Sequence, residues 1–154
     1  MSSITELAER LREKGIRTVE AGFGDLQGTL RGKRFPLKEI HRLDREGFAV
    51  CNGALCWDIQ CVVFPVGYAS FDTGYPDLQA RPVWETLRPS TWDDRTAFVL
   101  CDVLDGDGTP LPESPREVLK GVLRHADRLG FAPQVGTELE FYLLGEDRKP
   151  LYPG

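Results

Sequence analysis

Two glutamates, Glu138 and Glu140, lie two positions apart in the mostly apolar stretch of residues 134–144. In a β-strand such side chains point to the same face, so a strand here puts the two carboxylates about 7 Å apart at the backbone. Hard divalent cations prefer carboxylate oxygens, and the paired metals of phosphoryl-transfer sites lie about 3.5–4 Å apart. The pattern therefore suggests a metal site, and the simpler interpretation is the solvated face of an amphipathic strand.

The element directly before this segment is predicted to be a helix with clear boundaries. Ser114 is the predicted N-cap, Pro115 occupies the first helical position, and Glu117 completes a capping box. Gly130 ends the helix. Its apolar stripe is formed by Val118, Val122, Leu123, Ala126 and Leu129.

Upstream, helical periodicity alternates with strand-like patterns. Apolar residues at three- and four-residue steps predict helices over residues 3–14 and 36–46. Turn-forming residues at 25–28 join two predicted strands, residues 16–23 and 29–35, into a hairpin.

The middle of the chain is less regular. Residues 96–104 predict a buried strand, whereas residues 48–64 have no clean period and are interpreted as strand–loop–strand. Glycines and prolines interrupt residues 65–89, which are predicted to be an irregular segment, either functional or mobile. The order of elements indicates an α+β fold with helices on one face of a small sheet, and a break near residues 108–112.

Composition limits the classes of function. A net charge of −5, from 24 acids and 19 bases, and the lack of a basic stripe argue against a nucleic-acid partner. Neither a secretory signal nor a membrane-spanning apolar run is recognisable, so a cytoplasmic protein without a membrane partner is expected. Without a Cys-x-x-Cys pair, the cysteines are predicted to be small buried residues: Cys51, Cys56, Cys61 and Cys101. Two histidines are predicted to be surface or boundary residues, His41 and His125.

Four segments, in this order and at this spacing, resemble the glutamine synthetase family. They are Gly-Thr-Leu-Arg-Gly-Lys-Arg at 28–34, Ala-Phe-Val-Leu-Cys-Asp at 97–102 with Asp-Gly at 107–108, Ser-Pro-Arg at 114–116, and Gly-Thr-Glu-Leu-Glu-Phe at 136–141. Each motif is modest alone, and the combination is specific. The resemblance extends over nearly the whole chain from Ile16 onward.

The resemblance implies a fold and a reaction. Residues 1–110 would form the family's N-terminal β-grasp-like domain, and residues 111–154 the truncated start of its catalytic domain. The family joins glutamate to ammonia or an amine at the expense of ATP, through a γ-glutamyl phosphate, with Mg²⁺ or Mn²⁺ as cofactor. By position, Glu138 would serve the metal nearer the ATP phosphates and Glu140 the metal nearer glutamate. A ring-shaped homo-oligomer is also implied.

One position departs from the family's ammonia-using members. These carry an Asp-Gly whose acid helps to bind ammonium, and here the nearest match is Asn52-Gly53. An amide neither accepts a proton nor balances a cation. Asp58 is a candidate substitute, and residues 72–77 and 86–92 resemble the γ-glutamylpolyamine synthetase-like branch, which suggests a larger amine substrate. The simpler interpretation of Asn52 is that it forms an Asn-Gly turn.

Because the family's remaining metal ligands and its ATP pocket would lie beyond Gly154, the 154-residue chain by itself is predicted to have no ligase activity and to bind Mg²⁺ weakly. An alternative is a non-catalytic module that forms a subunit interface or binds a partner, since the family's N-terminal domain packs against a neighbouring subunit. A third possibility is an acidic β-grasp binding domain without ligase ancestry.

Overall fold

The structure is a computed structural model that describes residues 3–64 and 69–151, and its contacts divide the chain into two units, Met1–Val122 and Leu123–Gly154. Three α-helices, six strands and three short 3-10 helices (η) are assigned among the described residues. In chain order they are α1 (Ile4–Glu13), β1 (Thr18–Gly24), β2 (Leu30–Pro36), η1 (Leu37–Glu39), α2 (Ile40–Glu46), β3 (Phe48–Cys51), η2 (Asn52–Leu55), β4 (Asp77–Pro82), η3 (Trp84–Thr86), β5 (Arg88–Pro89), β6 (Thr96–Leu104) and α3 (Pro115–Arg128).

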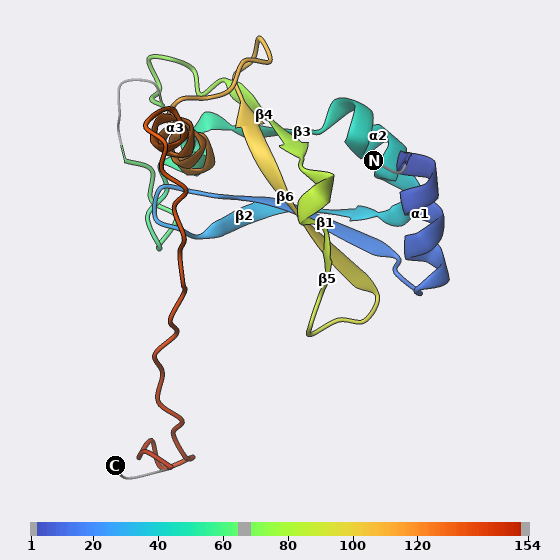
Figure 1. Cartoon of the computed structure of the whole chain (residues 1–154), viewed down its shortest axis with the longest axis vertical. Helices are drawn as coiled ribbons and strands as arrows, with labels where there is room; N and C mark the ends of the chain where they lie inside the picture. The colour runs from blue at the N-terminus through green and yellow to red at the C-terminus, as the bar shows by residue number, and fades with distance from the viewer. Residues whose placement is uncertain (1–2, 65–68, 152–154) are drawn as a thin grey trace. The chain divides into compact units, whose positions relative to one another are not determined.

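The first unit is organised by a curled sheet in the order β2-β1-β6-β4-β3 (Figure 1). The β1–β2 hairpin is antiparallel, with Thr18 opposite Pro36 and Gly24 opposite Leu30. Strand β1 also pairs with β6 in parallel, from Thr18 opposite Thr96 onward. A hairpin beside a parallel central pair is a β-grasp-like arrangement, so the predicted α+β class is confirmed.

Strand β6 connects the two halves of the sheet. Its first half pairs with β1 on one side and β5 on the other, and its second half pairs with β4, where Gln79 lies opposite Leu104. Its burial alternates along the strand, as expected when one face covers a core. The core-facing residues of β6 are Ala97, Val99, Cys101 and Val103.

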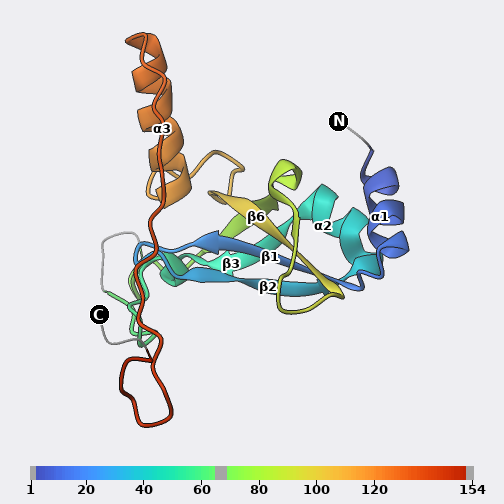
Figure 2. The ribbon, with the colours of Figure 1, turned by 60° about the horizontal axis from the view of Figure 1, so that its bottom comes forward.

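The helices α1 and α2 lie side by side at one end of the sheet (Figures 1 and 2). Helix α1 begins with a capping box, in which the Ser3 hydroxyl accepts from the Glu6 N–H and the Glu6 carboxylate accepts from the Ser3 N–H. Helix α2 contributes Ile40 and Leu43, which are 1% and 0% exposed, to the core. Burial of these apolar side chains is the main stabilising contribution to this unit.

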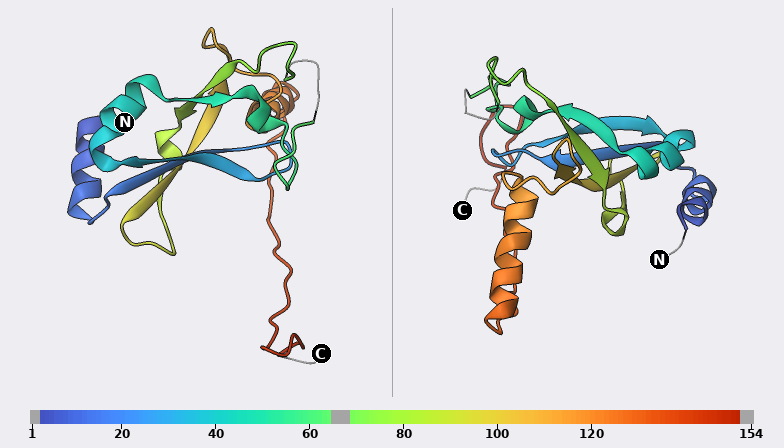
Figure 3. Two further views of the ribbon diagram at one scale, coloured as in Figure 1. Left: turned by 180° about the vertical axis from the view of Figure 1, so that it is seen from behind. Right: turned by 90° about the horizontal axis from the view of Figure 1, so that it is seen from above.

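The opposite end of the sheet carries the β1–β2 turn and residues 52–64, which follow β3, as the view from behind also shows (Figure 3). The predicted irregular segment 65–89 is wrong in part, because it contains β4, which pairs with both β3 and β6. Pro76 precedes β4 and Pro82 is its last residue, so these prolines limit the strand without interrupting it. Residues 65–68 of that prediction lie outside the described part of the chain.

The second unit begins inside α3. That helix is present where the sequence predicts it, but none of its residues is buried. The predicted strand over residues 134–144 is wrong, because residues 131–143 have neither helix nor strand assignment. A strand requires a ladder of hydrogen-bonded neighbours, and among the described residues this segment has only the bond from the Leu151 N–H to the Leu143 carbonyl and an isolated bridge between Leu144 and Pro150.

The boundary predicted after residue 110 differs in position from the division after Val122 and stays a prediction. The histidine prediction is confirmed, since His41 and His125 are both exposed. Within residues 3–64 and 69–151, no helix combines the length and apolarity needed to cross a bilayer.

Candidate functional site

Asn52, the first residue of η2, is one of the residues that line a hollow of about 420 Å³ (the Asn52 hollow). Asn52 is only 2% exposed, and its N–H donates to the carbonyl of Pro76 at 3.0 Å, which closes the base of the segment between β3 and β4. Among the described residues that line the hollow, Asp105 and Glu113 are acidic and none is basic. The hollow therefore favours a positively charged group over an anion.

Gly53 allows an aromatic ring to lie close to this turn. A Cβ at Gly53 would come within 3.3 Å of the Tyr75 ring, so the missing side chain leaves room for that ring. The Tyr75 ring also meets Phe71 edge to face, with centroids 5.2 Å apart. The predicted Asn-Gly turn is present as a buried 3-10 turn, whose conformation depends on this packing.

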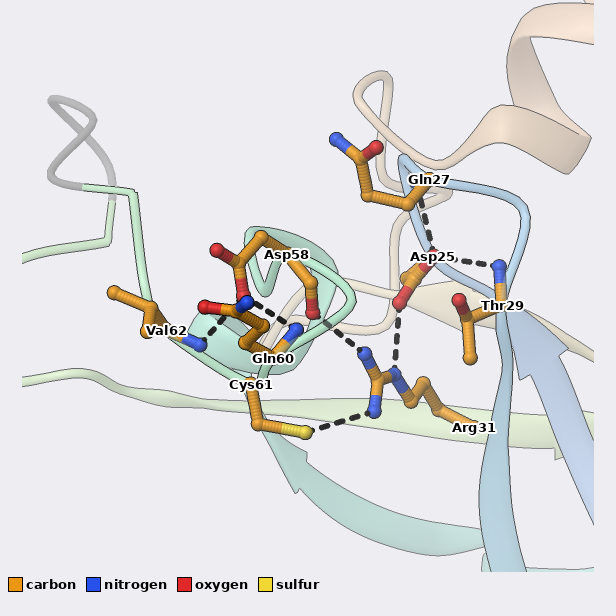
Figure 4. Close-up of polar contacts among 8 residues, drawn as sticks. All are labelled: Asp25, Gln27, Thr29, Arg31, Asp58, Gln60, Cys61 and Val62. Atoms are coloured by element: carbon orange, nitrogen blue, oxygen red, sulfur yellow. Dashed lines mark hydrogen bonds and ion pairs between the residues drawn. The ribbon is translucent and has the colours of Figure 1, made fainter.

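Asp58, the second predicted substrate residue, is not among the residues that line the Asn52 hollow. Its carboxylate Oδ1 accepts from the N–H groups of Gln60 at 2.8 Å and Val62 at 2.9 Å (Figure 4). These are bonds of an Asx turn, in which the side chain shapes its own loop. The structure thus does not bring Asp58 and Asn52 into one site.

A cluster around Arg31 holds the loop of residues 56–64, which follows η2 directly. The Arg31 Nε donates to the Asp25 carboxylate at 2.7 Å, its Nη2 to the Asp58 carbonyl at 3.2 Å, and its Nη1 to the Cys61 sulfur at 3.3 Å (Figure 4). The guanidinium carbon also lies 5.1 Å from the centroid of the Trp57 ring. Arg31 therefore connects the β1–β2 hairpin to this loop.

Asp25 is the buried member of this cluster. Its side chain is fully inaccessible, and its Oδ1 accepts from the N–H groups of Gln27 at 2.9 Å and Thr29 at 2.8 Å. Hydrogen bonding to Asp25 raises the pKa of the Arg31 guanidinium above its usual value. The guanidinium thus stays charged across the working pH range.

The alternation of residues along β2 is a signal for this cluster. Strand alternation places Arg31 on the same face as Phe35, which is buried, and the hairpin register places Arg31 opposite Phe23, also buried. A cation on a core-facing position needs an anionic partner, and Asp25 in the preceding turn is the nearest acid.

A second ion-pair cluster fixes the beginning of α3 to β6. Asp102 accepts from Arg116 Nε at 2.7 Å and from Lys120 Nζ at 2.5 Å. All three side chains are between 28% and 36% exposed, so solvent screens the ion pairs in part. These residues lie within the first unit and hold the first turns of the helix.

Glu138 and Glu140 are both exposed and lie on the extended segment without strand pairing. Their carboxylates have the chemistry that Mg²⁺ or Mn²⁺ requires, but two ligands do not complete an octahedral site. Within the described residues, no group of three or more His, Cys, Asp or Glu side chains could hold a metal ion.

The cysteine prediction is half right. Cys56 and Cys101 are buried, whereas Cys51 and Cys61 are exposed, and no disulfide joins any of the four. Burial raises the pKa of the Cys101 thiol to about 12.

No family model matches the chain. Three curated relatives are similar over most of its length. Glutamate–isopropylamine ligase from Pseudomonas is 31% identical over 93% of this chain, and γ-glutamylethanolamide synthetase GlnA4 from Streptomyces coelicolor is 38% identical over 90%. Type-1 glutamine synthetase 2 from Dictyostelium discoideum is 32% identical over 86%. The chain spans only 26–32% of the length of these relatives.

Solved structures give the same result. The complex of GmaS with ADP has a TM-score of 0.64 and 29% identity over 84% of this chain, and 26% of its own length is covered. The glutamine synthetase of Plasmodium falciparum, at 20% identity and a TM-score of 0.60, shows the same fold. From the four motifs, the curled sheet and these matches together, the chain belongs to the glutamine synthetase family.

Proposed function

We propose that the chain is the N-terminal portion of an ATP-dependent glutamate–amine ligase that acts through a γ-glutamyl phosphate. The observation that carries the choice of an amine is Asn52, a buried amide at a position where the family's ammonia users have an acid. An amide cannot take the proton that ammonium must lose. A hollow of about 420 Å³ has room for a substrate larger than ammonia.

The charges at this hollow support an amine over a neutral nucleophile. Asp105 and Glu113 provide negative charge at its lining, which attracts an ammonium group. The name of one relative states isopropylamine and the name of another states an ethanolamide, and both match this chain over 90% or more of its length. A monoamine or a diamine is thus the expected second substrate.

The test uses the complete protein with glutamate, ATP and Mg²⁺, and compares ammonia, isopropylamine and putrescine as nucleophiles. Mass spectrometry of the γ-glutamyl product and phosphate release measure the reaction. We expect the amines to be used with a higher kcat/KM than ammonia. A clear preference for ammonia contradicts the proposal.

Asn52→Asp supplies a matched variant, since it restores an acid without changing the size of the side chain. We expect the variant to gain ammonia-dependent activity relative to amine-dependent activity, because the new carboxylate can balance and deprotonate ammonium. Asn52→Leu, of similar size and without polar atoms, is the control for a change of shape alone.

Glu138 and Glu140 are proposed to be two of the ligands of a divalent-metal site, with further donors from residues outside this chain. Glu138→Gln and Glu140→Gln keep the size of each side chain and remove its charge. In the complete protein each should weaken Mn²⁺ binding, measured by calorimetry, by about tenfold or more. Glu146→Gln, also on an exposed residue of this segment, is the control.

The remaining expectations belong to the same proposal. The 154-residue chain alone should have no ligase activity, the complete protein should be a cytoplasmic homo-oligomeric ring, and residues 1–110 should form a domain distinct from the start of the catalytic domain. A stop codon directly after Gly154 in the coding sequence would instead favour a non-catalytic module that forms a subunit interface or binds a partner. Limited proteolysis and light scattering measure the domain boundary and the oligomeric state.

A further inference from the structure

The segment that contains Asn52 leaves the sheet after Cys51 and returns to it at Asp77, and these two residues pair across β3 and β4. Its base is closed by the bond from the Asn52 N–H to the Pro76 carbonyl. A connection this long keeps one conformation only when further contacts fix it to the scaffold. The contacts of its first half therefore determine how rigidly Asn52 is presented.

Residues 56–64 form a loop that is closed on itself. The Phe64 N–H donates to the Cys56 carbonyl at 3.0 Å, and the Asp58 N–H donates to the Val62 carbonyl at 2.9 Å. The Asp58 carboxylate adds the bonds of the Asx turn. These bonds give the loop its shape, but none of them fixes the loop to the sheet.

Trp57 and Val63 of this loop pack against the core, and Arg31 adds a polar attachment to the sheet. One guanidinium reaches the Asp58 carbonyl and the Cys61 sulfur (Figure 4). The same group lies over the Trp57 ring. The planar group presents five N–H donors in fixed directions, so it makes these contacts and the bond to Asp25 at the same time. A lysine ammonium is a point charge on a flexible stem and cannot reproduce this geometry.

Arg31 is itself fixed by the β1–β2 turn. Asp25 holds its Nε, and the bonds from Gln27 and Thr29 hold Asp25. The same turn also reaches η2 directly, since the Leu26 N–H donates to the carbonyl of Leu55, the last residue of η2, at 3.2 Å. The turn, Arg31, the loop and the short helix that begins at Asn52 thus form one connected set of contacts.

We propose that Arg31 is a positioning residue for amine binding, because it holds the 56–64 loop and thereby the conformation of η2 at Asn52. The inference rests on the proposed function. Arg31 is not among the residues that line the Asn52 hollow, so it acts through the loop and not by contact with the substrate. Its loss should affect the amine and leave the other two substrates largely unaffected.

Arg31→Lys in the complete protein tests the kinetic part. The lysine keeps a positive charge beside buried Asp25 and so avoids an unpaired carboxylate, but it loses the contacts with the loop. We expect the KM for the amine to rise about tenfold, since a small misplacement of a binding group is costly, while the KM values for glutamate and ATP change less than about twofold. Arg34→Lys is the matched control, because Arg34 lies on the same strand, is 64% exposed and pairs with Glu20.

Thiol labelling of this chain tests the structural part independently of any activity. In a Cys51→Ser background, Cys61 is the exposed thiol that contacts Arg31, and Cys56 and Cys101 are buried. We expect 5,5′-dithiobis(2-nitrobenzoate) to label Cys61 several-fold faster in Arg31→Lys than in the parent, and at the parent rate in Arg34→Lys. Circular dichroism should show that both variants remain folded.

The outcomes separate this inference from the proposed function. Faster labelling together with a selective rise in the amine KM supports it. Unchanged labelling overturns the attachment by Arg31, and faster labelling with an equal change in all three KM values overturns its role in amine binding. A complete protein that forms no γ-glutamyl product overturns the proposed function and this kinetic role with it, whereas the labelling result still decides whether Arg31 holds the loop.

Discussion

Strand β6 of the first unit and residues 134–144 of the second unit (the glutamate segment) both alternate side chains in a strand-like pattern, but only β6 is a strand. In β6, alternating residues meet a core, and Val99 is 0% exposed. In residues 134–144 the alternation is equally regular, yet Leu139 is 83% exposed and Phe141 is 75% exposed. Alternation selects the face that a strand buries, but the strand forms only where neighbours complete its hydrogen bonds.

The largest expected effect comes from the buried ion pair of the first unit. Asp25→Ala leaves Arg31 without its carboxylate at a position where the arginine side chain is 16% exposed. We expect the free energy of unfolding to fall by about 3–5 kcal/mol, as when one partner of a buried pair is removed. Urea unfolding of this chain measures the change.

The control for Asp25 is Glu20→Ala, which removes a pair with the largely exposed Arg34. This loss should be below about 1 kcal/mol. Equal losses in the two variants would contradict the assignment of the Asp25–Arg31 pair as the tighter one.

The same leucine-to-alanine change should have different effects on stability in the core of the first unit and in the glutamate segment. Leu43→Ala removes a side chain that is 0% exposed and should cost about 2–5 kcal/mol of unfolding free energy. Leu139→Ala, the same change at an 83% exposed residue, should change it by less than about 0.5 kcal/mol. A comparable cost at Leu139 would mean that the glutamate segment is packed, and the contrast between the regions would disappear.

The cluster at the start of α3 should have an intermediate effect. Asp102→Ala removes the acceptor of Arg116 and Lys120, and partial exposure limits the loss to about 1 kcal/mol. Hydrogen exchange should increase in residues 115–122 before it increases in β1. Unchanged protection of α3 would show that its first turns do not depend on Asp102.

The smallest effect concerns pH. Burial raises the pKa of Cys101 from 9.0 to about 12, so the folded state favours the neutral thiol. Because the unfolded thiol ionises first, stability is retained below about pH 9 and declines as the pH rises from there towards 12. Unfolding of Cys101→Ala and the parent at pH 7 and pH 10 measures this, and the variant should lose less stability on the alkaline side.

Local patterns were sufficient for much of the fold. Residues 3–14, 96–104 and the hairpin of residues 16–35 were predictable because each has a regular period and recognisable end residues. Strand β4 was not, because the glycines and prolines around it dominate a short window, and its pairing with β3 and β6 is long-range.

The candidate site was less predictable than the fold. Asn52 could be identified from the sequence because it departs from a motif. Asp105 and Glu113, which line the same hollow, follow β6 and are more than 50 positions away in the chain, so no local pattern connects them to Asn52. The role of Arg31 was not predicted, because the basic run of residues 31–34 is too short to interpret by its charge. Strand alternation nevertheless places Arg31 on the face of β2 that carries the buried Phe35. Asp58 was predicted for its charge, whereas the structure uses its carboxylate as a local acceptor.

Strand β6 pairs with three other strands, and this determines how the sheet unfolds. One strand supplies the ladder partners of β1 and β5 with its first residues, those of β4 with its last, and the carboxylate that holds α3 with Asp102. Both halves of the sheet lose their ladder partner when β6 unfolds, so loss of this one strand releases both halves together. Thermal melting of the first unit should accordingly be a single cooperative event.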